Sequence, residues 1–141
     1  MKLIGKRKLT KLAKKNTGNV KLQKCIKAFE KEVTQRIWTN QQELSSSTIT
    51  FDSVHPDGFY IADIHVHRAM VAITFINLKE LEELDNELET LGVEEKIIEE
   101  QKRELGEVGV LWVGTHDEYE RVFGNNKAVI EKWLRSQGHI P

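Results

Sequence analysis

The sequence predicts an α+β domain in which helices come first and strands follow. Before residue 40 the apolar residues recur at helical spacing, whereas from residue 48 to residue 76 they alternate or run together as they do in β-strands. The length of 141 residues is that of one ordinary domain. We therefore expect residues 1–141 to form a single domain, with the helices on one face of a small antiparallel sheet.

The N-terminal part is predicted to hold a short strand and two basic helices. KLIG suits an edge strand, and KRKLTKLAKK suits a helix that ends at residues 16–18, where Asn and Gly tolerate the left-handed conformation. The next helix is the clearest in the chain, because apolar residues form one stripe from Val20 to Ile37 with lysines between them. Trp38 and Leu44 close this unit, and residues 45–47 are expected to form a loop.

Strand signals begin at Thr48. TITF is short and β-prone, and His55-Pro-Asp-Gly58 has the composition of a turn. The run FYIADIHVHRAMVAITFI, residues 59–76, is too long for one typical strand and is expected to contain a turn. The strand VGVLWVG comes later, followed by a helix from His116 or Asp117 and by a last helix that begins at residues 125–126.

An acidic helical hairpin is predicted between two of the strands. Residues 78–106 carry two apolar helical stripes, which end at Gly92 and Gly106. We expect an inserted hairpin over 78–106 and a C-terminal helical extension over 123–141. The hairpin could simply lengthen a connection, cover the basic surface, or dock a partner or a second copy.

Charge is segregated along the chain, although the net charge is −1. Residues 1–36 hold twelve Lys and Arg against two Glu, a balance of +10, and residues 78–107 hold twelve acids against four bases, a balance of −8. The basic part indicates a polyanion partner, although two solvated helix faces of opposite sign give the same pattern. The chain has one cysteine and no apolar run of membrane-spanning length, so we expect a cytoplasmic protein without disulfides or membrane contact.

One pattern raises the question of a metal. Asp63, His65 and His67 alternate, and on a continuous strand all three would project from one face as a metal triad. A turn near these residues would break that arrangement and leave an ordinary polar surface. The chain also lacks a glycine-rich phosphate loop and a G-x-S-x-G nucleophile turn. The sequence therefore favours a site with no metal and no cofactor.

Metal-free cleavage of RNA fits the remaining polar residues. Attack of a 2′-hydroxyl on the adjacent phosphate needs a base, an acid and a cation, which His, Tyr and Arg can supply. Arg68 enters one strand, and His116 and Tyr119 follow another. Thr115 and Glu118 also fit a helix capping box. GTHDEY could therefore be the capped start of a helix as well as a catalytic site. The basic residues expected to hold the RNA backbone are Lys6, Lys8, Lys11, Lys14, Lys15, Lys31 and Arg36.

GTHDEYERV, residues 114–122, closely resembles the G-T-H-x-E-Y-D-K-I signature of the HigB family of toxins. LIGKRKLTKL is similar to the opening strand and helix of that family, IKAFEKEVTQRIWTNQQEL to its amphipathic helix ending in W-x-N-x-x-E-L, and HRAMVAITF to its Y-R-L-I-V-R-I strand. The resemblance covers most of residues 1–76 and 109–122. The segments 78–106 and 123–141 have no counterpart in it, and the family's second strand arginine falls at Ala72.

The resemblance implies a RelE-like fold and an endoribonuclease that cleaves mRNA, often on the ribosome, and that a helix-turn-helix antitoxin holds inactive. By position, Arg68 matches the strand arginine that would stabilise the scissile phosphate. His116 would transfer protons, and Tyr119 would position the RNA or stack on it. Two alternatives stay open: a non-catalytic RNA- or protein-binding module with the toxin fold, and a metal-dependent enzyme that uses Asp63, His65 and His67.

Overall fold

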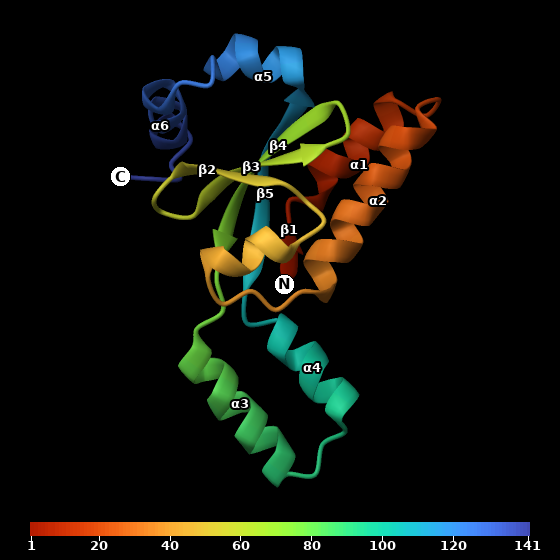
Figure 1. The fold of residues 1–141 in the computed structure, drawn as a ribbon, viewed down its shortest axis with the longest axis vertical. Helices are drawn as coiled ribbons and strands as arrows, with labels where there is room; N and C mark the ends of the chain where they lie inside the picture. Colours follow the sequence, from red (N-terminus) through yellow and green to blue (C-terminus); the bar gives the residue numbers. More distant parts are fainter.

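The computed structural model describes residues 1–141 and has an α+β fold (Figure 1). The elements follow in the order β1 (Lys2–Ile4), α1 (Lys6–Lys15), α2 (Val20–Gln35), a 3₁₀ helix (Gln41–Ser46), β2 (Phe51–His55), β3 (Phe59–Ile64), β4 (His67–Thr74), α3 (Leu78–Thr90), α4 (Glu95–Arg103), β5 (Glu107–Thr115), α5 (His116–Phe123) and α6 (Lys127–Ser136). The strands form one sheet in the order β1-β5-β4-β3-β2. The predicted turn within residues 59–76 is confirmed, because β3 and β4 are separate antiparallel strands.

The sheet is mixed, so the predicted antiparallel sheet is wrong at one pair. β1 lies beside β5 and runs parallel to it, with Lys2 opposite Glu107. The other three pairs are antiparallel. The chain between β1 and β5 is long enough for the crossover that a parallel pair needs. A strand of three residues carries no pattern of its own that would identify its neighbour.

Helices cover both faces of the sheet, whereas the sequence predicted them on one. α1 and α2 pack on the face that carries Tyr60 and Val71. α5 and α6 pack on the face that carries Ile61 and Met70. In Figure 1 the sheet accordingly stands between α6 on the left and α1 and α2 on the right. Because β3 and most of β4 are buried on both sides, their apolar residues run together instead of alternating.

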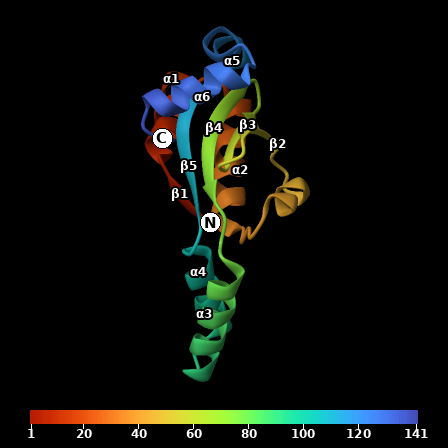
Figure 2. The same ribbon diagram turned by 90° about the vertical axis from the view of Figure 1, so that its left-hand side faces the viewer.

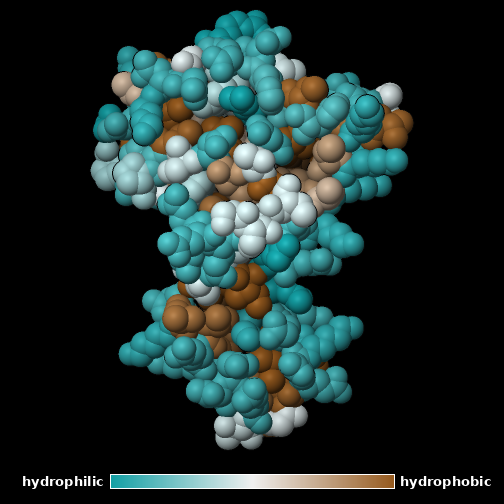
Figure 3. Space-filling view, viewed as in Figure 1, coloured by the Kyte–Doolittle hydropathy of each residue, from teal (hydrophilic) through white to brown (hydrophobic).

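α3 and α4 form an acidic arm at the end of the sheet where β4 ends and β5 begins (Figures 1 and 2). Thr74 pairs with Glu107 at its base. Apolar residues gather between the two helices and hydrophilic residues line the outer sides (Figure 3). Across the pair, Lys102 Nζ lies 3.7 Å from Asp85 Oδ1. The arm projects along the long axis of the molecule, away from the C-terminal part of α1. The lysines in that part of α1 are exposed, so the arm does not cover them.

The segment before β2 differs from the sequence prediction. Residues 45–47 were predicted as a loop, but a 3₁₀ helix extends to Ser46, and the side chain of Asn40 caps its start by accepting from the N–H of Glu43 at 3.1 Å. Of the TITF segment, only Phe51 belongs to β2. Ile49 is buried in the core although it lies outside any strand. This burial explains why the segment is as apolar as a strand.

Gly5 allows β1 to turn directly into α1. Its φ is 79°, a left-handed conformation that glycine adopts without strain. A Cβ at this position would lie 2.5 Å from the carbonyl oxygen of Val110 in β5. The close approach of this turn to β5 therefore requires the absence of a side chain.

Replacing Gly5 by alanine is expected to lower the free energy of unfolding by about 2 kcal/mol or more, because the left-handed conformation alone costs roughly 1–2 kcal/mol and the clash with β5 adds to it. Urea unfolding followed by circular dichroism measures the change. Gly18→Ala is the matched control, since a Cβ there meets nothing within 4 Å. Equal stability of the two variants would contradict this account of the turn.

Candidate functional site

The predicted site residues meet at one end of the sheet, opposite the arm. In the β4–β5 pair, His67 lies opposite Thr115 and Arg68 lies opposite Gly114. The backbone N–H of His116 donates to the carbonyl oxygen of Val66 at 3.1 Å. This bond ties the β3–β4 turn to the start of α5. Two segments far apart in the sequence are thus held side by side.

α5 begins at His116, and the predicted capping box closes its first turn. The N–H of Glu118 donates to Thr115 Oγ1 at 3.0 Å, and the N–H of Thr115 donates to Glu118 Oε1 at 2.9 Å. The backbone hydrogen bond from Thr115 holds the pKa of Glu118 below its ordinary value of 4.5, against the opposing effect of desolvation. Capping therefore fixes the backbone position from which His116 projects.

Aromatic packing holds α5 against the sheet. The Trp112 ring lies 5.2 Å from the Phe123 ring and 6.2 Å from the Tyr119 ring, between centroids. A Cβ at Gly114 would lie 2.6 Å from the Trp112 ring. The glycine of the G-T-H motif is thus explained by packing, because it leaves room for the indole.

Asp63, Arg68 and His116 form a charged cluster on the α5 side of the sheet. Asp63 Oδ1 lies 3.6 Å from Arg68 Nε and 3.8 Å from His116 Nε2. These are ion-pair distances and are too long for hydrogen bonds; none of the three atoms has a hydrogen-bond partner in the protein. The side chains of Arg68, Asp63 and His116 are 26%, 39% and 44% exposed. The three facing atoms are themselves enclosed, so a ligand reaches the exposed parts of these side chains first and must displace the carboxylate to contact Arg68 Nε and His116 Nε2.

Tyr119 lies under Arg68 and is not part of the open surface. The guanidinium carbon of Arg68 stands 4.8 Å from the centroid of the Tyr119 ring, a cation–π contact. Tyr119 is 1% exposed, and its hydroxyl donates to Asn125 Oδ1 at 3.4 Å. Burial raises the pKa of Tyr119. A buried ring has no free face for an RNA base, so this structure offers no room for the expected stacking, and the ring contacts Arg68 instead.

The suggested metal triad is not formed. His65 lies in the turn between β3 and β4 with a φ of 56°. Asp63 pairs with Arg68 and His67 pairs with Ile64, so Asp63 and His67 project from opposite faces of the sheet. No group of three or more His, Cys, Asp and Glu side chains is arranged to hold a metal ion. Asp63, which the sequence suggested only as a metal ligand, is instead the shared neighbour of Arg68 and His116.

Three of the predicted RNA-binding lysines line a hollow on the other side of the same sheet end. The hollow has a volume of about 430 Å³ and lies between α1 and the end of β5. We call it the lysine hollow; the residues that define it are Lys8, Lys11, Lys15, His67, Thr115 and Glu118. The lysines stand on one stripe of α1 and are exposed. The sequence did not predict that His67 would contact a polyanion. Its position opposite Thr115 in the β4–β5 pair places it in the lysine hollow.

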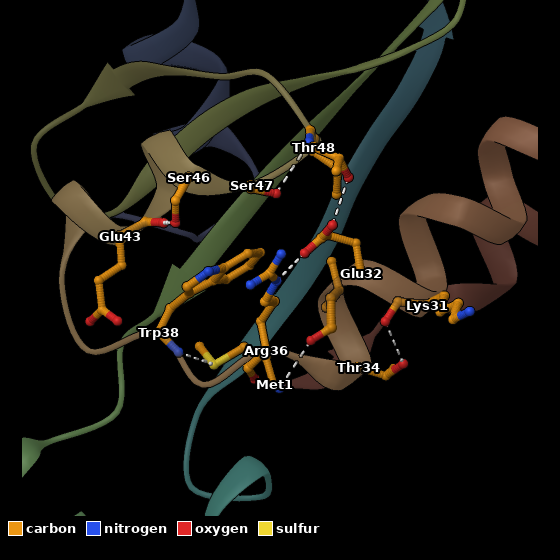
Figure 4. Close-up of polar contacts among 12 residues, drawn as sticks. Met1, Lys31, Glu32, Thr34, Arg36, Trp38, Glu43, Ser46, Ser47 and Thr48 are labelled. Carbon is orange, nitrogen blue, oxygen red and sulfur yellow. Dashed lines mark hydrogen bonds and ion pairs between the residues drawn. The ribbon is translucent and has the colours of Figure 1, made fainter.

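The remaining predicted cations lie elsewhere. Lys6 Nζ is 3.6 Å from Glu30 Oε2. Arg36 is paired with Glu32, which also accepts from Thr48 Oγ1 at 2.6 Å (Figure 4). The amino group of Met1 donates to the carbonyl oxygen of Arg36, which places Arg36 at the β1 end of the molecule.

Lys14 and Lys31 are exposed but do not line the lysine hollow. Lys31 borders a separate hollow together with Arg36. The seven predicted cations therefore do not line a single hollow.

Comparison with known proteins identifies no relative. Protein-family models, curated proteins and solved structures each gave no match to the chain. No helix is both long and apolar enough to cross a membrane. The observations that bear on function are therefore the charged cluster on one side of the sheet end and the lysine hollow on the other.

Removing the capping carboxylate should weaken the fold in a pH-dependent manner. Because the pKa of Glu118 is lowered in the folded state, its contribution is present above the ordinary value of 4.5 and is lost as the pH falls through the lowered value. Glu118→Ala is expected to cost about 1 kcal/mol at pH 7 and much less at pH 3. Urea unfolding at the two pH values measures the difference.

Glu120→Ala is the matched control, since Glu120 lies on the same helix, is exposed and forms no cap. A loss of stability for Glu118→Ala that is the same at both pH values would show that the carboxylate hydrogen bond is not the cause.

Proposed function

We propose that this chain is a HigB-like toxin with a RelE-like fold, an endoribonuclease that cleaves mRNA without a metal or a cofactor. The observation that carries the proposal is the position of Asp63 Oδ1, within ion-pair distance of both Arg68 Nε and His116 Nε2. A phosphate oxygen that replaced this carboxylate oxygen would contact a guanidinium and an imidazole together. These are the cation and the proton-transfer group that cleavage through a 2′-hydroxyl requires.

His116 would act first, as the general base. Its imidazole takes the proton of the 2′-hydroxyl while the 2′-oxygen forms a bond to phosphorus. Arg68 stabilises the negative charge that develops on the phosphate oxygens. The bond from phosphorus to the 5′-oxygen then breaks, and the leaving oxygen takes a proton from a water molecule. The imidazolium of His116 afterwards releases its proton to the hydroxide that remains. The products are a 2′,3′-cyclic phosphate and a 5′-hydroxyl.

Tyr119 and Asp63 would position the reacting groups without touching the RNA. The Tyr119 ring supports the guanidinium from the protein side at 4.8 Å. Asp63 holds Arg68 and His116 near each other in the absence of substrate. The aromatic packing and the capping box keep this arrangement in place, so little reorganisation is required when RNA binds.

The toxin proposal includes partners. The substrate is mRNA, free or on the ribosome, and the inhibitor is a small helix-turn-helix antitoxin, as the resemblance of residues 114–122 implies. Both partners place the protein in the cytoplasm. Arrest of growth on expression, relieved by co-expression of a helix-turn-helix protein encoded beside this chain, is the cellular result expected.

One observation favours a second function, a non-catalytic RNA-binding module. Asp63 neutralises Arg68, and Ala72, on the same face of β4, supplies no second cation. If the carboxylate held Arg68 permanently, the cluster would bind a phosphate weakly and cleavage would not occur. RNA would then be held by the lysines alone, with an affinity that falls steeply as salt rises.

His116→Ala is expected to lower the rate of RNA cleavage at least about 100-fold, because general acid–base catalysis contributes roughly 10²–10⁴-fold. Cleavage of a labelled RNA, with and without ribosomes, measures the rate. His65→Asn is the matched control: it removes an exposed histidine from the adjacent turn, and asparagine tolerates the left-handed conformation found there. Cleavage that persists in His116→Ala would exclude His116 as the base, and RNA binding without cleavage by the wild-type protein would favour the binding module.

Asp63→Asn is expected to separate binding from catalysis. Removing the carboxylate frees Arg68 for the substrate phosphate, so KM should fall several-fold, on the order of the 1 kcal/mol typical of an exposed ion pair. By contrast kcat should change little, because the substrate phosphate has already displaced the carboxylate when His116 acts. Steady-state kinetics gives both constants. A variant with KM and kcat both unchanged would show that Asp63 does not position the cluster.

A further inference from the structure

The lysine hollow contains a buried polar group that the fold leaves without a partner. His67 is 6% exposed, and its Nδ1 atom has no hydrogen-bond partner in the protein. Apart from tyrosines, no other polar or charged side chain is as deeply buried. Its ring nevertheless lines the hollow beside Thr115. An unpaired imidazole nitrogen is costly to bury. Nδ1 is enclosed by protein atoms, so a ligand in the polar hollow would contact the other part of the ring, which borders the hollow.

The charges around the hollow define the kind of ligand. Lys8, Lys11 and Lys15 contribute three positive charges, and Glu118 contributes one negative charge. The carboxylate of Glu118 already accepts a hydrogen bond from the Thr115 backbone. With His67 neutral, the formal balance is +2. A phosphodiester carries one negative charge, whereas a phosphate monoester carries between about −1.5 and −2 at pH 7, which matches the hollow more closely.

We propose that the lysine hollow is a binding site for a phosphate monoester dianion, held by Lys8, Lys11 and Lys15 and by a hydrogen bond from the imidazole of His67. The volume of about 430 Å³ accommodates the phosphate and part of the group that carries it. The terminal phosphate of an RNA strand and a free phosphate or mononucleotide share this chemistry. The site needs binding and no cleavage, so it does not rest on the proposed function of the charged cluster.

The hollow and the charged cluster lie on opposite faces of one sheet end. His67 and Arg68 are neighbours in β4 and project to opposite sides. A strand whose 5′ end is anchored by the lysines would have to cross this edge to reach His116. The phosphate site would therefore fix the number of nucleotides between the 5′ end of an RNA and the position that reaches His116. It would take no part in the cleavage chemistry.

Binding of the dianion should change the titration of His67. Burial lowers the pKa of His67, with His65 and His116 acting in the same direction and Glu118 opposing them. The groups that act on the ring are Glu118 and His116 from α5 and His65 from the turn. Lys8, Lys11 and Lys15 from α1 line the same hollow. A bound dianion favours the protonated imidazole, so the pKa measured by NMR should rise when inorganic phosphate is added.

The decisive experiment compares two RNAs that cannot be cleaved. A short 2′-O-methyl RNA with a 5′-phosphate should bind about tenfold more tightly than the same RNA with a 5′-hydroxyl, and inorganic phosphate should compete with the first RNA. The double substitution Lys11→Gln and Lys15→Gln should abolish this preference. In the control Lys24→Gln and Lys27→Gln, which removes the same charge from the exposed side of α2, the preference should survive even if both RNAs bind more weakly.

The outcomes are separable from those of the cleavage assay, since 2′-O-methyl RNA has no attacking hydroxyl. A 5′-phosphate preference assigns the site to RNA ends. Binding of inorganic phosphate that shifts the His67 resonances, with no preference between the RNAs, assigns it to free phosphate compounds. If neither probe shifts His67 and the two RNAs bind equally, the proposal is overturned. The lysine variants test it even if substitution of the buried His67 prevents folding.

Discussion

The pairing of β4 with β5 is the contact on which both the fold and the candidate site depend. One end of this pair joins His67 to Thr115, and the other joins Thr74 to Glu107 at the base of the arm. A bulge between Met70 and Val71 adds one residue, Leu111, to β5. Strand side chains alternate between faces, so this extra residue turns Trp112 and Gly114 toward α5, whereas Val108 and Val110 face α1 and α2. Without the bulge, Gly114 would not lie across from Arg68 on that face.

The same pairing converts a separation of charge along the sequence into a separation in space. The acidic residues of the arm lie beyond the end of the sheet that carries Glu107. Three lysines of α1 (Lys8, Lys11 and Lys15) and Arg68 lie at the end that carries Thr115. The carboxylates of the arm therefore lie away from both the lysine hollow and the charged cluster. A polyanion would be repelled from the arm and attracted to the end that holds His116, which favours one direction of approach over distances comparable to the Debye length.

The α-helices, the capping box of Thr115 and Glu118, and a turn within residues 59–76 could be predicted. Each depends on local sequence: an apolar stripe, a pair of capping side chains or a run too long for one strand. The parallel partner of β1 could not be predicted, since three residues do not specify a neighbour. Nor could the role of Asp63, which depends on the left-handed turn at His65 that sets it opposite Arg68. The burial of Tyr119 could not be predicted either, because it depends on tertiary packing. Trp112 and Phe123 pack around the ring, and the GTHDEY motif does not indicate this.

Whether the charged cluster can act on RNA depends on how firmly Asp63 holds Arg68. Both side chains are partly exposed and their nearest polar atoms are 3.6 Å apart, so the pair lacks the short, paired hydrogen bonds of a strong carboxylate–guanidinium contact. An exposed ion pair of this kind contributes roughly 0–1 kcal/mol. A phosphate that accepts two hydrogen bonds from the guanidinium, and a third from His116, forms a stronger contact and also releases counterions from the RNA. On these magnitudes an RNA phosphate would displace the carboxylate, and this is the physical argument for proposing the nuclease over the binding module.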